Sequence, residues 1–276
     1  MAIARALARQ GFDVALLARS QQRLDAAVRT IREESGAYAR VATVSVDVSD
    51  AESVDRAFDR LMSEFGTPSV VIHAAGIAYP DYFLRIPESM VDATVRTNLS
   101  GSWNVLRAAV AAMRSADSPP VGAGLPRTAA SPLARAVARG RRFIVPVSSM
   151  AGLIPVFGYT AYGMSKFGVT GMALALRQET AADGISVSVV CPPDVDTPQL
   201  VQEAATKPPE TAAVGGNGKP MSPETVANEV LRRLPRNPAL IIPGFGARLD
   251  YFAYRVAPRV VEKILFQRIR SVTGRI

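Results

Sequence analysis

Cysteine and histidine are each present only once in the 276 residues, as Cys191 and His73. A single cysteine excludes an intrachain disulfide framework and a cysteine-rich zinc site. It is consistent with a reducing compartment. The one histidine, at the end of an apolar run, lacks the partners that a metal site requires, so we expect it to be packed in the interior and predict no metal ion.

Long hydrophobic runs are also lacking. No apolar run reaches the ~20 residues that a membrane-spanning helix requires. The opening segment MAIARALARQG has an amphipathic helical pattern without the long apolar centre of a signal peptide. We therefore expect a cytoplasmic protein, with peripheral contact to a membrane surface as an open alternative.

Acidic residues are the minority among the charged ones, and the formal net charge is +8. Such an excess suits a nucleic acid, an anionic membrane or a phosphorylated cofactor, or it reflects a liberal general use of arginine. The basic residues are not grouped around aromatic residues in a nucleic-acid-binding module, so no nucleic-acid partner is expected.

Short apolar runs alternate with helical patterns along most of the chain. This alternation predicts an α/β fold: a Rossmann-like, doubly wound parallel sheet with helices on both faces. Strands are expected at 12–18, 41–46, 69–73, 143–147, 185–191 and 239–242. Helices are expected at about 1–10, 21–35, 50–65, 88–114, 158–182 and 223–234. Ligands of such sheets bind at the carboxyl ends of the strands.

Two segments interrupt the alternation. Residues 115–140, rich in Ala, Pro, Gly and Arg, are interpreted as an inserted flexible loop, and 194–221 as a substrate-side loop with little regular structure. The predicted organisation is one domain over 1–244, followed by basic amphipathic helices over 245–276 that Pro258 divides.

Candidate chemistry begins with the segment YGMSK, in which Tyr162 and Lys166 are four residues apart on a predicted helix. This spacing places both side chains on one helix face. A nearby ammonium lowers the pKa of a phenol, which would make Tyr162 a better proton donor at neutral pH. Ser149, at the end of a predicted strand, can hydrogen-bond a substrate carbonyl, and the amide of Asn98 can hold a water near Lys166.

These motifs, in their order, resemble those of the short-chain dehydrogenase/reductase superfamily. The similar segments are AAG at 74–76, Asn98 with Gly101, the serine pair 148–149, YGMSK at 162–166 and the proline pair 192–193. The resemblance implies that Tyr162 exchanges the proton, Lys166 tunes it and binds the nicotinamide ribose, Ser149 orients the carbonyl and Asn98 completes a proton relay.

The cofactor implied is NADP(H). An acidic residue after the 12–18 strand would hold the ribose hydroxyl of NAD, whereas the arginine found there, Arg19, accommodates a 2′-phosphate; the alternative is an ordinary surface arginine. Asp47 and Val48 resemble the adenine-contacting pair, although Asp47 could equally serve as a helix-entry residue. The predicted cofactor-binding residues are Arg19, Ser20, Asp47, Val48, Ala74, Ala75, Gly76, Tyr162, Lys166, Pro192, Pro193, Asp194 and Thr197.

Two features depart from the family pattern. The usual first strand and the glycine-rich phosphate-binding turn are lacking, because Met1 begins within the helix that follows them. We interpret the sequence as an incomplete gene model, the alternative being a relative that no longer binds cofactor. His73 stands where an asparagine often precedes AAG.

The substrate is suggested by CPPDVDTPQL at 191–200, TKPPET at 206–211 and AGIAYPDYFLRIP at 75–87. These segments resemble the 3-ketodihydrosphingosine reductase branch, which implies reduction of 3-ketosphinganine to sphinganine with NADPH. The alternatives are another hydrophobic ketone or alcohol, such as a steroid or acyl chain, and a non-catalytic lipid- or protein-binding relative. A homodimer or homotetramer is expected by the same resemblance. The basic tail 245–276 is either a membrane-surface helix or an ordinary packed helix pair.

Overall fold

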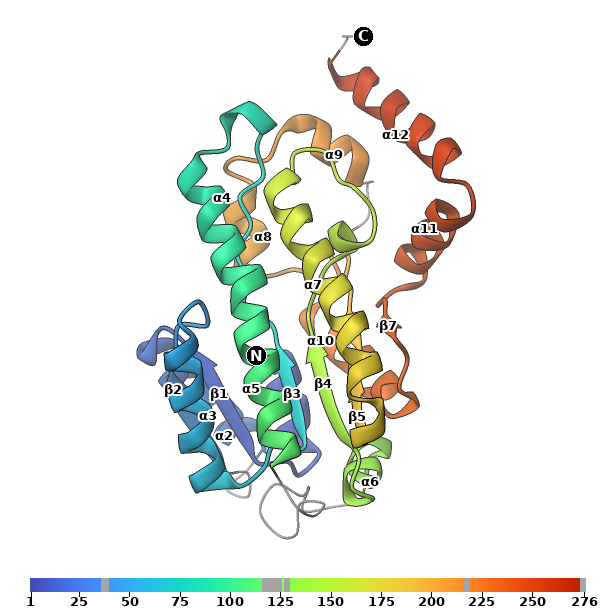
Figure 1. Ribbon diagram of the computed structural model, residues 1–276. Helices are drawn as coiled ribbons and strands as arrows, with labels where there is room; N and C mark the ends of the chain where they lie inside the picture. The colour runs from blue at the N-terminus through green and yellow to red at the C-terminus, as the bar shows by residue number, and fades with distance from the viewer. Residues whose placement is uncertain (36–39, 116–125, 127–129, 216–218, 274–276) are drawn as a thin grey trace.

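The computed structural model describes the chain except residues 36–39, 116–125, 127–129, 216–218 and 274–276. Its strands form a parallel sheet system with helices on both faces (Figure 1), as predicted. The strands are β1 (Val14–Ala18), β2 (Val41–Ser45), β3 (Val70–His73), β4 (Arg142–Pro146), β5 (Ile185–Val187), β6 (Val189–Val190) and β7 (Leu240–Ile241). The strand predicted at 185–191 is therefore divided in two.

Helices at the predicted places cover the strands. They are α1 (Ala2–Arg9), α2 (Gln21–Ser35), α3 (Ala51–Phe65), α4 (Glu88–Thr94), α5 (Gly101–Arg114), α7 (Thr160–Glu179) and α10 (Pro223–Arg233). Between α4 and α5 lies a π-helical turn, η2 (Val95–Ser100), so the predicted helix 88–114 continues through it. Local signals explain two of the starts: Asp50 caps α3, and Ser222 before Pro223 caps α10.

The alternation of β4 side chains divides the core into two layers. Ile144 packs with α3, α5 and α7 on one face, whereas Phe143 and Val145 pack with α1 and α10 on the other. All three side chains are fully buried, as expected for a central parallel strand.

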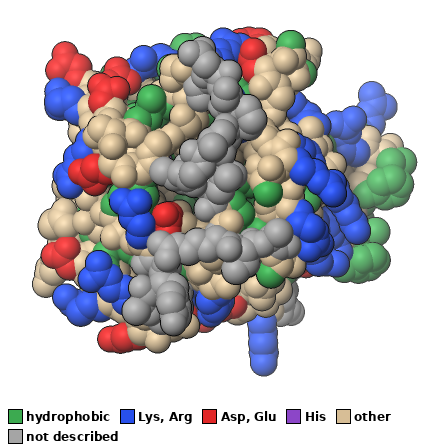
Figure 2. Space-filling model, turned by 90° about the horizontal axis from the view of Figure 1, so that it is seen from below, with side chains coloured by type: hydrophobic (Ala, Val, Ile, Leu, Met, Phe, Trp, Pro, Cys, Tyr) green, Lys and Arg blue, Asp and Glu red, His purple; other side chains and the backbone are tan. Residues whose placement is uncertain are grey.

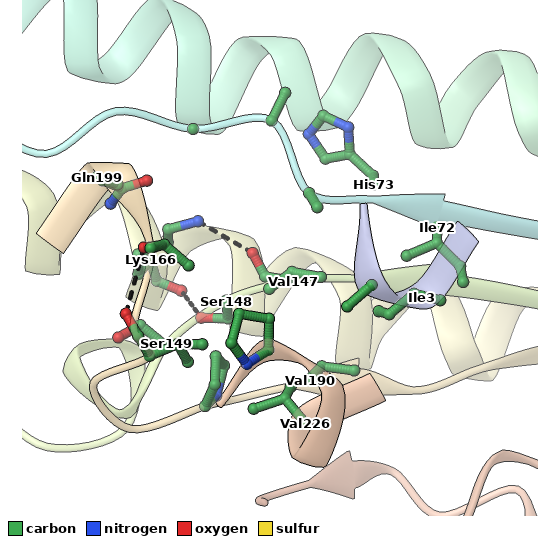
Figure 3. A pocket seen from close by; sticks show the side chains of 18 of the residues that line it. Ile3, Ile72, His73, Val147, Ser148, Ser149, Lys166, Val190, Gln199 and Val226 are labelled. Carbon is green, nitrogen blue, oxygen red and sulfur yellow. Dashed lines mark hydrogen bonds between the residues drawn. The ribbon is translucent and has the colours of Figure 1, made fainter. Parts of the chain in front are cut away.

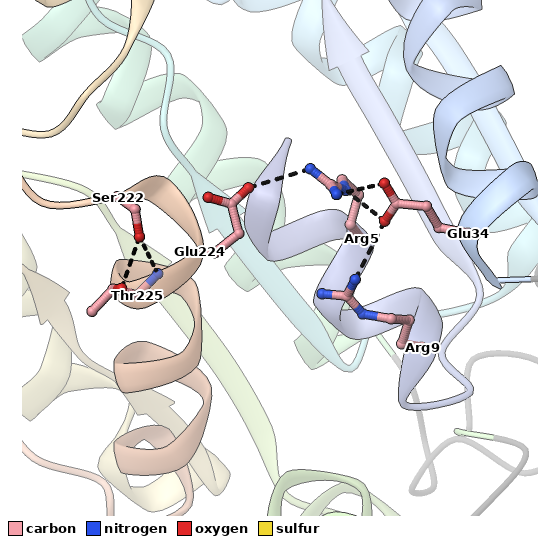
Figure 4. A network of polar contacts seen from close by, with 6 residues as sticks. All are labelled: Arg5, Arg9, Glu34, Ser222, Glu224 and Thr225. Atoms are coloured by element: carbon pink, nitrogen blue, oxygen red, sulfur yellow. Dashed lines mark hydrogen bonds and ion pairs between the residues drawn. The ribbon is translucent and has the colours of Figure 1, made fainter.

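Ion pairs between exposed side chains connect α1 to its neighbours (Figure 4). Arg5 lies between Glu34 of α2, at 2.5 Å, and Glu224 of α10, at 3.3 Å. Arg9 adds a second contact to Glu34 at 3.3 Å. Partly exposed pairs of this kind stabilise a fold only modestly, so their main effect is on the orientation of α1.

The sheet is interrupted between β1 and β3. In the described part of the chain β1 pairs only with β2, and β3 only with β4, so the two strands do not pair with each other. Residues of both strands line one cavity.

The prediction of two irregular loops is partly wrong, because both segments contain short helices. Within 115–140, residues Pro132–Ala138 form a helix, α6, because Ser131 caps it and its apolar side chains, including Leu133 and Val137, are buried; residues 116–125 and 127–129 lie outside the described part. The predicted loop 194–221 contains α8 (Pro198–Glu203) and α9 (Pro209–Gly215). Helices this short give little periodic signal in a sequence.

The C-terminal segment forms two helices that extend away from the sheet (Figure 1), α11 (Phe245–Val256) and α12 (Pro258–Thr273). They divide at Pro258, as predicted. The structure contains no helix in its described part that is long and apolar enough to cross a bilayer.

Candidate active site

A cavity of about 2030 Å³ extends along β1 and β3, in the interruption between them, and past the carboxyl ends of these strands. From the strand ends it continues to the N-terminal part of α7 and to α11 and α12. All the residues predicted to bind a cofactor line it: Arg19, Ser20, Asp47, Val48, Ala74, Ala75, Gly76, Tyr162, Lys166, Pro192, Pro193, Asp194 and Thr197. The structure therefore brings together residues from five separate segments.

Tyr162 and Lys166 lie one turn apart on α7 and both face this cavity. The Lys166 ammonium is 5.5 Å from the centre of the Tyr162 ring and donates a hydrogen bond of 3.0 Å to the carbonyl of Val147. Figure 3 shows this bond at the cavity wall. Burial lowers the pKa of Lys166 to about 8, because the charged form loses hydration.

The expectation that Lys166 lowers the pKa of Tyr162 is wrong for this structure. Burial raises the pKa of the Tyr162 phenol above its usual value, and the negative charges of Glu203 and Asp194 act in the same direction. Hydrogen bonds with Ser149 and Gln199 oppose the shift but do not reverse it. The phenol therefore holds its proton at neutral pH and can donate it to an oxygen atom in the cavity.

Ser149 follows β4 and turns its hydroxyl toward the cavity beside Tyr162. Its hydroxyl oxygen accepts a hydrogen bond of 3.1 Å from the amide of Ala151, which fixes the rotamer. The preceding Ser148 is buried and donates to the carbonyl of Lys166 at 2.9 Å, so it connects the strand end to α7. Ser149 and Tyr162 can thus hydrogen-bond a single carbonyl oxygen.

Asn98 lies behind the cavity, completely buried in the π-helical turn. Its amide oxygen accepts from the amide of Ile77 at 2.8 Å, and its amide nitrogen donates to the carbonyl of the same residue at 2.8 Å. The nitrogen also donates to Ser165 at 3.0 Å. The side chain therefore holds the segment after β3 against α7, a role that the sequence did not indicate.

Gly76 lies where these elements meet, and there is little space there for a side chain. A Cβ atom added there would lie 3.3 Å from both the Asn98 amide oxygen and the Lys166 ammonium. Ala74 and Ala75, just before it, present small exposed side chains to the cavity. This close approach of backbone leaves room for a flat ring and a ribose beside Lys166, so the described residues fit the nicotinamide half of a dinucleotide.

At the opposite end of the cavity, Arg19 is exposed and Ser20 accepts a hydrogen bond from the amide of Arg23 at the start of α2. The Asp47 carboxylate accepts from the amide and hydroxyl of Ser49, and these hydrogen bonds lower its pKa. Asp47 thus acts as a turn residue before α3, yet it also lines the cavity. The fit is less complete for a pyrophosphate, because in place of a glycine-rich turn the first turn of α1 lines the cavity.

His73 is buried, as expected, at the end of β3 (Figure 3). Within the described residues its Nε2 has no hydrogen-bond partner. Burial, with a smaller contribution from the charge of Lys166, lowers the pKa of His73 to about 4. Among the described residues no group of three His, Cys, Asp or Glu side chains could hold a metal ion.

The buried His73 makes stability depend on pH. Because its pKa is lowered on folding, the unfolded chain binds the extra proton, and stability falls as the pH drops from about 6.5 to about 4. The loss is expected to approach about 3 kcal/mol. Urea unfolding of the wild type and of a His73→Asn variant at several pH values tests this: the wild type should lose stability relative to the variant between pH ~6.5 and ~4, and the difference should be constant above pH ~6.5. Parallel pH curves would contradict it.

Three cavity residues were missed from the sequence. Tyr159 stacks edge-on against Tyr162 with ring centres 5.5 Å apart. Glu203 accepts a hydrogen bond of 2.5 Å from the Tyr159 hydroxyl and one of 2.8 Å from Gln199. Gln199 and Glu203 lie on α8, in the segment that was interpreted as a loop. Their spacing of four residues was the available signal.

Comparison with known proteins gives a consistent result. Residues 1–123 match the family described as enoyl-(acyl carrier protein) reductase, and residues 127–208 match the family described as short chain dehydrogenase. A 3-dehydrosphinganine reductase of Arabidopsis thaliana is 35% identical over 227 residues, which is 82% of this chain and 61% of the relative. A 3-ketodihydrosphingosine reductase of Mus musculus is 31% identical over 226 residues, 81% of this chain and 61% of the relative.

The chain thus spans about three fifths of the length of these relatives. Among solved structures, an alcohol dehydrogenase of Thermococcus sibiricus, complexed with 5-hydroxy-NADP, has a TM-score of 0.66 and 24% identity, with 87% of this chain and 89% of that chain covered. A short-chain dehydrogenase of Streptomyces avermitilis has a TM-score of 0.71 and 21% identity over 99% and 93% of the two chains. With the parallel sheet and the matched motifs, these findings place the chain in the short-chain dehydrogenase family.

Proposed function

We propose that this protein reduces the ketone of 3-dehydrosphinganine to the secondary alcohol of sphinganine, with NADPH as hydride donor. The observation that carries the proposal is the meeting of Ser149, Tyr162 and Lys166 at one cavity at the carboxyl ends of the strands. The similarity to reductases named for this substrate supports the choice among ketones. The apolar residues that α11 and α12 contribute to the cavity lining suit a hydrophobic substrate.

Each of the candidate site residues has its own role in the proposed reaction. When bound, NADPH supplies the hydride that forms the new C–H bond at the carbonyl carbon. Ser149 and Tyr162 hydrogen-bond the carbonyl oxygen, and Tyr162 transfers its proton to that oxygen as negative charge develops. Lys166 would hold the ribose hydroxyls of the bound cofactor and, together with Asn98, would connect the phenol to a source of replacement protons.

Arg19 is expected to determine the preference for NADPH over NADH. It lies at the cavity end after β1, where a guanidinium pairs with a 2′-phosphate and a carboxylate would instead bind a ribose hydroxyl. Ser20, Asp47 and Val48 would contact the adenosine, and Ala74–Gly76 would support the nicotinamide half, since all of them line the cavity. Pro192, Pro193, Asp194 and Thr197 close the cavity on the side of α8.

The direct test is oxidation of NADPH by the purified chain with dispersed 3-dehydrosphinganine, followed by identification of sphinganine as product. NADPH is expected to exceed NADH in kcat/KM. A panel with a steroid ketone and a simple long-chain ketone distinguishes the other hydrophobic substrates. If the protein bound none of the cofactors and reduced none of the ketones, the proposal would be overturned in favour of a non-catalytic, lipid- or protein-binding role.

We further propose that the protein binds a membrane surface through α11 and α12. Their large apolar side chains are unusually exposed, including Phe245 at 75%, Phe252 at 64% and Val256 at 67%. Seen from below, basic side chains gather on the side toward which these helices extend, next to hydrophobic ones (Figure 2). Apolar and cationic groups together are typical of helices that bind anionic bilayers.

A triple variant, Arg259→Gln, Lys263→Gln and Arg270→Gln, should bind vesicles containing phosphatidylserine about 100-fold more weakly, at about 1 kcal/mol per cation. Vesicle sedimentation measures this, with pure phosphatidylcholine for comparison. The matched control replaces three arginines of α2 and α3, Arg29, Arg56 and Arg60, with Gln. Equal losses in both variants would show that only net charge matters, against a role of the tail.

We also propose that the protein forms a dimer or tetramer through α5 and α7. Trp103 on α5 and Met164 and Phe167 on α7 are 59%, 51% and 43% exposed, which is unusual for large apolar side chains. A variant with Trp103→Glu and Phe167→Glu is expected to sediment as a monomer, whereas the wild type sediments as a dimer or tetramer. A monomeric wild type would refute this.

A further inference from the structure

Glu203 is a carboxylate buried in the substrate half of the cavity. The residue is only 7% exposed, although it is the last residue of the short helix α8. Its two oxygens accept hydrogen bonds from Tyr159 and Gln199, and within the described residues no Lys or Arg forms an ion pair with it. The nearby Lys207 ammonium lies 5.5 Å from the centre of the Tyr159 ring instead.

A buried carboxylate without a cation is costly, since neutral hydrogen bonds replace only part of its hydration. Each carboxylate oxygen can accept more than one hydrogen bond, so both oxygens of Glu203 can receive a further donor. Glu203 lines the cavity that also holds Ser149 and Tyr162. A cationic group of a ligand in that cavity would therefore gain a charge-assisted hydrogen bond.

The position of Glu203 relative to the reacting atoms is fixed by Gln199. This side chain hydrogen-bonds both the Tyr162 phenol and the Glu203 carboxylate, so only one residue separates the proton donor from the carboxylate. Tyr159 connects the same two residues on the other side, through its hydroxyl and its ring. A ketone held by the Tyr162 phenol would therefore lie close enough to feel the charge of Glu203, as the phenol itself does.

We propose that Glu203 binds the ammonium group of an α-amino ketone and so determines the specificity of the site for amino ketones over plain ketones. The inference rests on the proposed function, since in 3-dehydrosphinganine the amino group is on the carbon next to the carbonyl. With the carbonyl oxygen on Ser149 and Tyr162, the ammonium points toward α8 and neutralises the buried carboxylate. Glu203 is thus a specificity-determining residue, separate from the proton donor.

The experiment compares 3-dehydrosphinganine with its deamino analogue, 1-hydroxyoctadecan-3-one, in the wild type and in Glu203→Gln, with NADPH. Gln keeps the size of the side chain and can still accept from Tyr159 and hydrogen-bond Gln199. The wild type should prefer the amino ketone at least 10-fold in kcat/KM, and the variant should lose this preference, mainly through KM for the amino ketone. A charge-assisted hydrogen bond accounts for a factor of this order.

Glu210→Gln is the matched control. Glu210 is also buried, at 4% exposed, and accepts from the Tyr82 hydroxyl, but it does not line the cavity. This variant should keep the wild-type preference. Equal loss on both ketones in Glu203→Gln, or the same loss of preference in Glu210→Gln, would overturn the inference. A wild type that reduces the two ketones equally well overturns it while ketone reduction stands; a wild type that reduces neither overturns the proposed function itself.

Discussion

A Tyr162→Phe variant is expected to reduce its ketone about 1000-fold more slowly in kcat than the wild type. The phenol keeps its proton at neutral pH, since burial raises its pKa, and it lies beside Ser149 at the cavity. Removing a positioned general acid costs 10²–10⁴-fold, roughly, and Ser149 cannot replace it because its hydroxyl is a weaker acid. Stopped assays with product identification measure the loss.

The Tyr162→Phe variant should still bind NADPH. The ring of Tyr162 packs against Tyr159, and Phe preserves this contact. Binding of NADPH, followed by the enhancement of its fluorescence, is expected to differ little between variant and wild type. A variant that binds the cofactor and retains more than a tenth of wild-type kcat would exclude Tyr162 as the proton donor.

An Asn98→Leu variant is expected to lose about 3 kcal/mol or more of unfolding free energy. The leucine fits the space of the amide but removes three hydrogen bonds, and it leaves the amide and carbonyl of Ile77 unpaired next to the buried π-helical turn. Each unsatisfied buried group costs ~1–3 kcal/mol. Denaturant unfolding with constant slope measures this loss.

The same variant separates the two roles given to Asn98. Ser102→Ala is a suitable control, because Ser102 lies one turn further on, is also buried and hydrogen-bonds only the carbonyl of Asn98. It should cost about 1 kcal/mol. If Asn98→Leu were as stable as the wild type but inactive, the proton relay would be its function and the positioning of the segment after β3 would be unimportant.

The sequence predicted that the candidate site residues lie together, because its strongest signals define the positions of strands and helices. Apolar runs locate the strands, parallel strands bring their carboxyl ends to one edge, and Arg19, Asp47, Gly76 and Ser149 all follow a strand. The spacing of Tyr162 and Lys166 placed them on one helix face. None of these deductions requires knowledge of side-chain packing.

The burial of individual side chains and the presence of short helices could not be predicted from these signals. The spacing of Tyr162 and Lys166 suggested a lowered pKa for the phenol, but burial of the phenol in the cavity wall raises that pKa. Likewise α6, α8 and α9 have six or seven residues each, too few to show a helical period, so their contributions to the site and core were missed. Glu203 was missed for the same reason.

The interruption between β1 and β3 has a consequence for how the chain behaves at high concentration. The register of the parallel pairs leaves the backbone groups of Ala15, Leu17, Val70 and Ile72 directed away from their bonded neighbours and toward the interruption. Two such edges, facing each other across apolar walls, form a template that an extended segment of any molecule can complete. A concentrated solution of this 276-residue chain is therefore expected to form a slow, β-rich precipitate, which light scattering would detect.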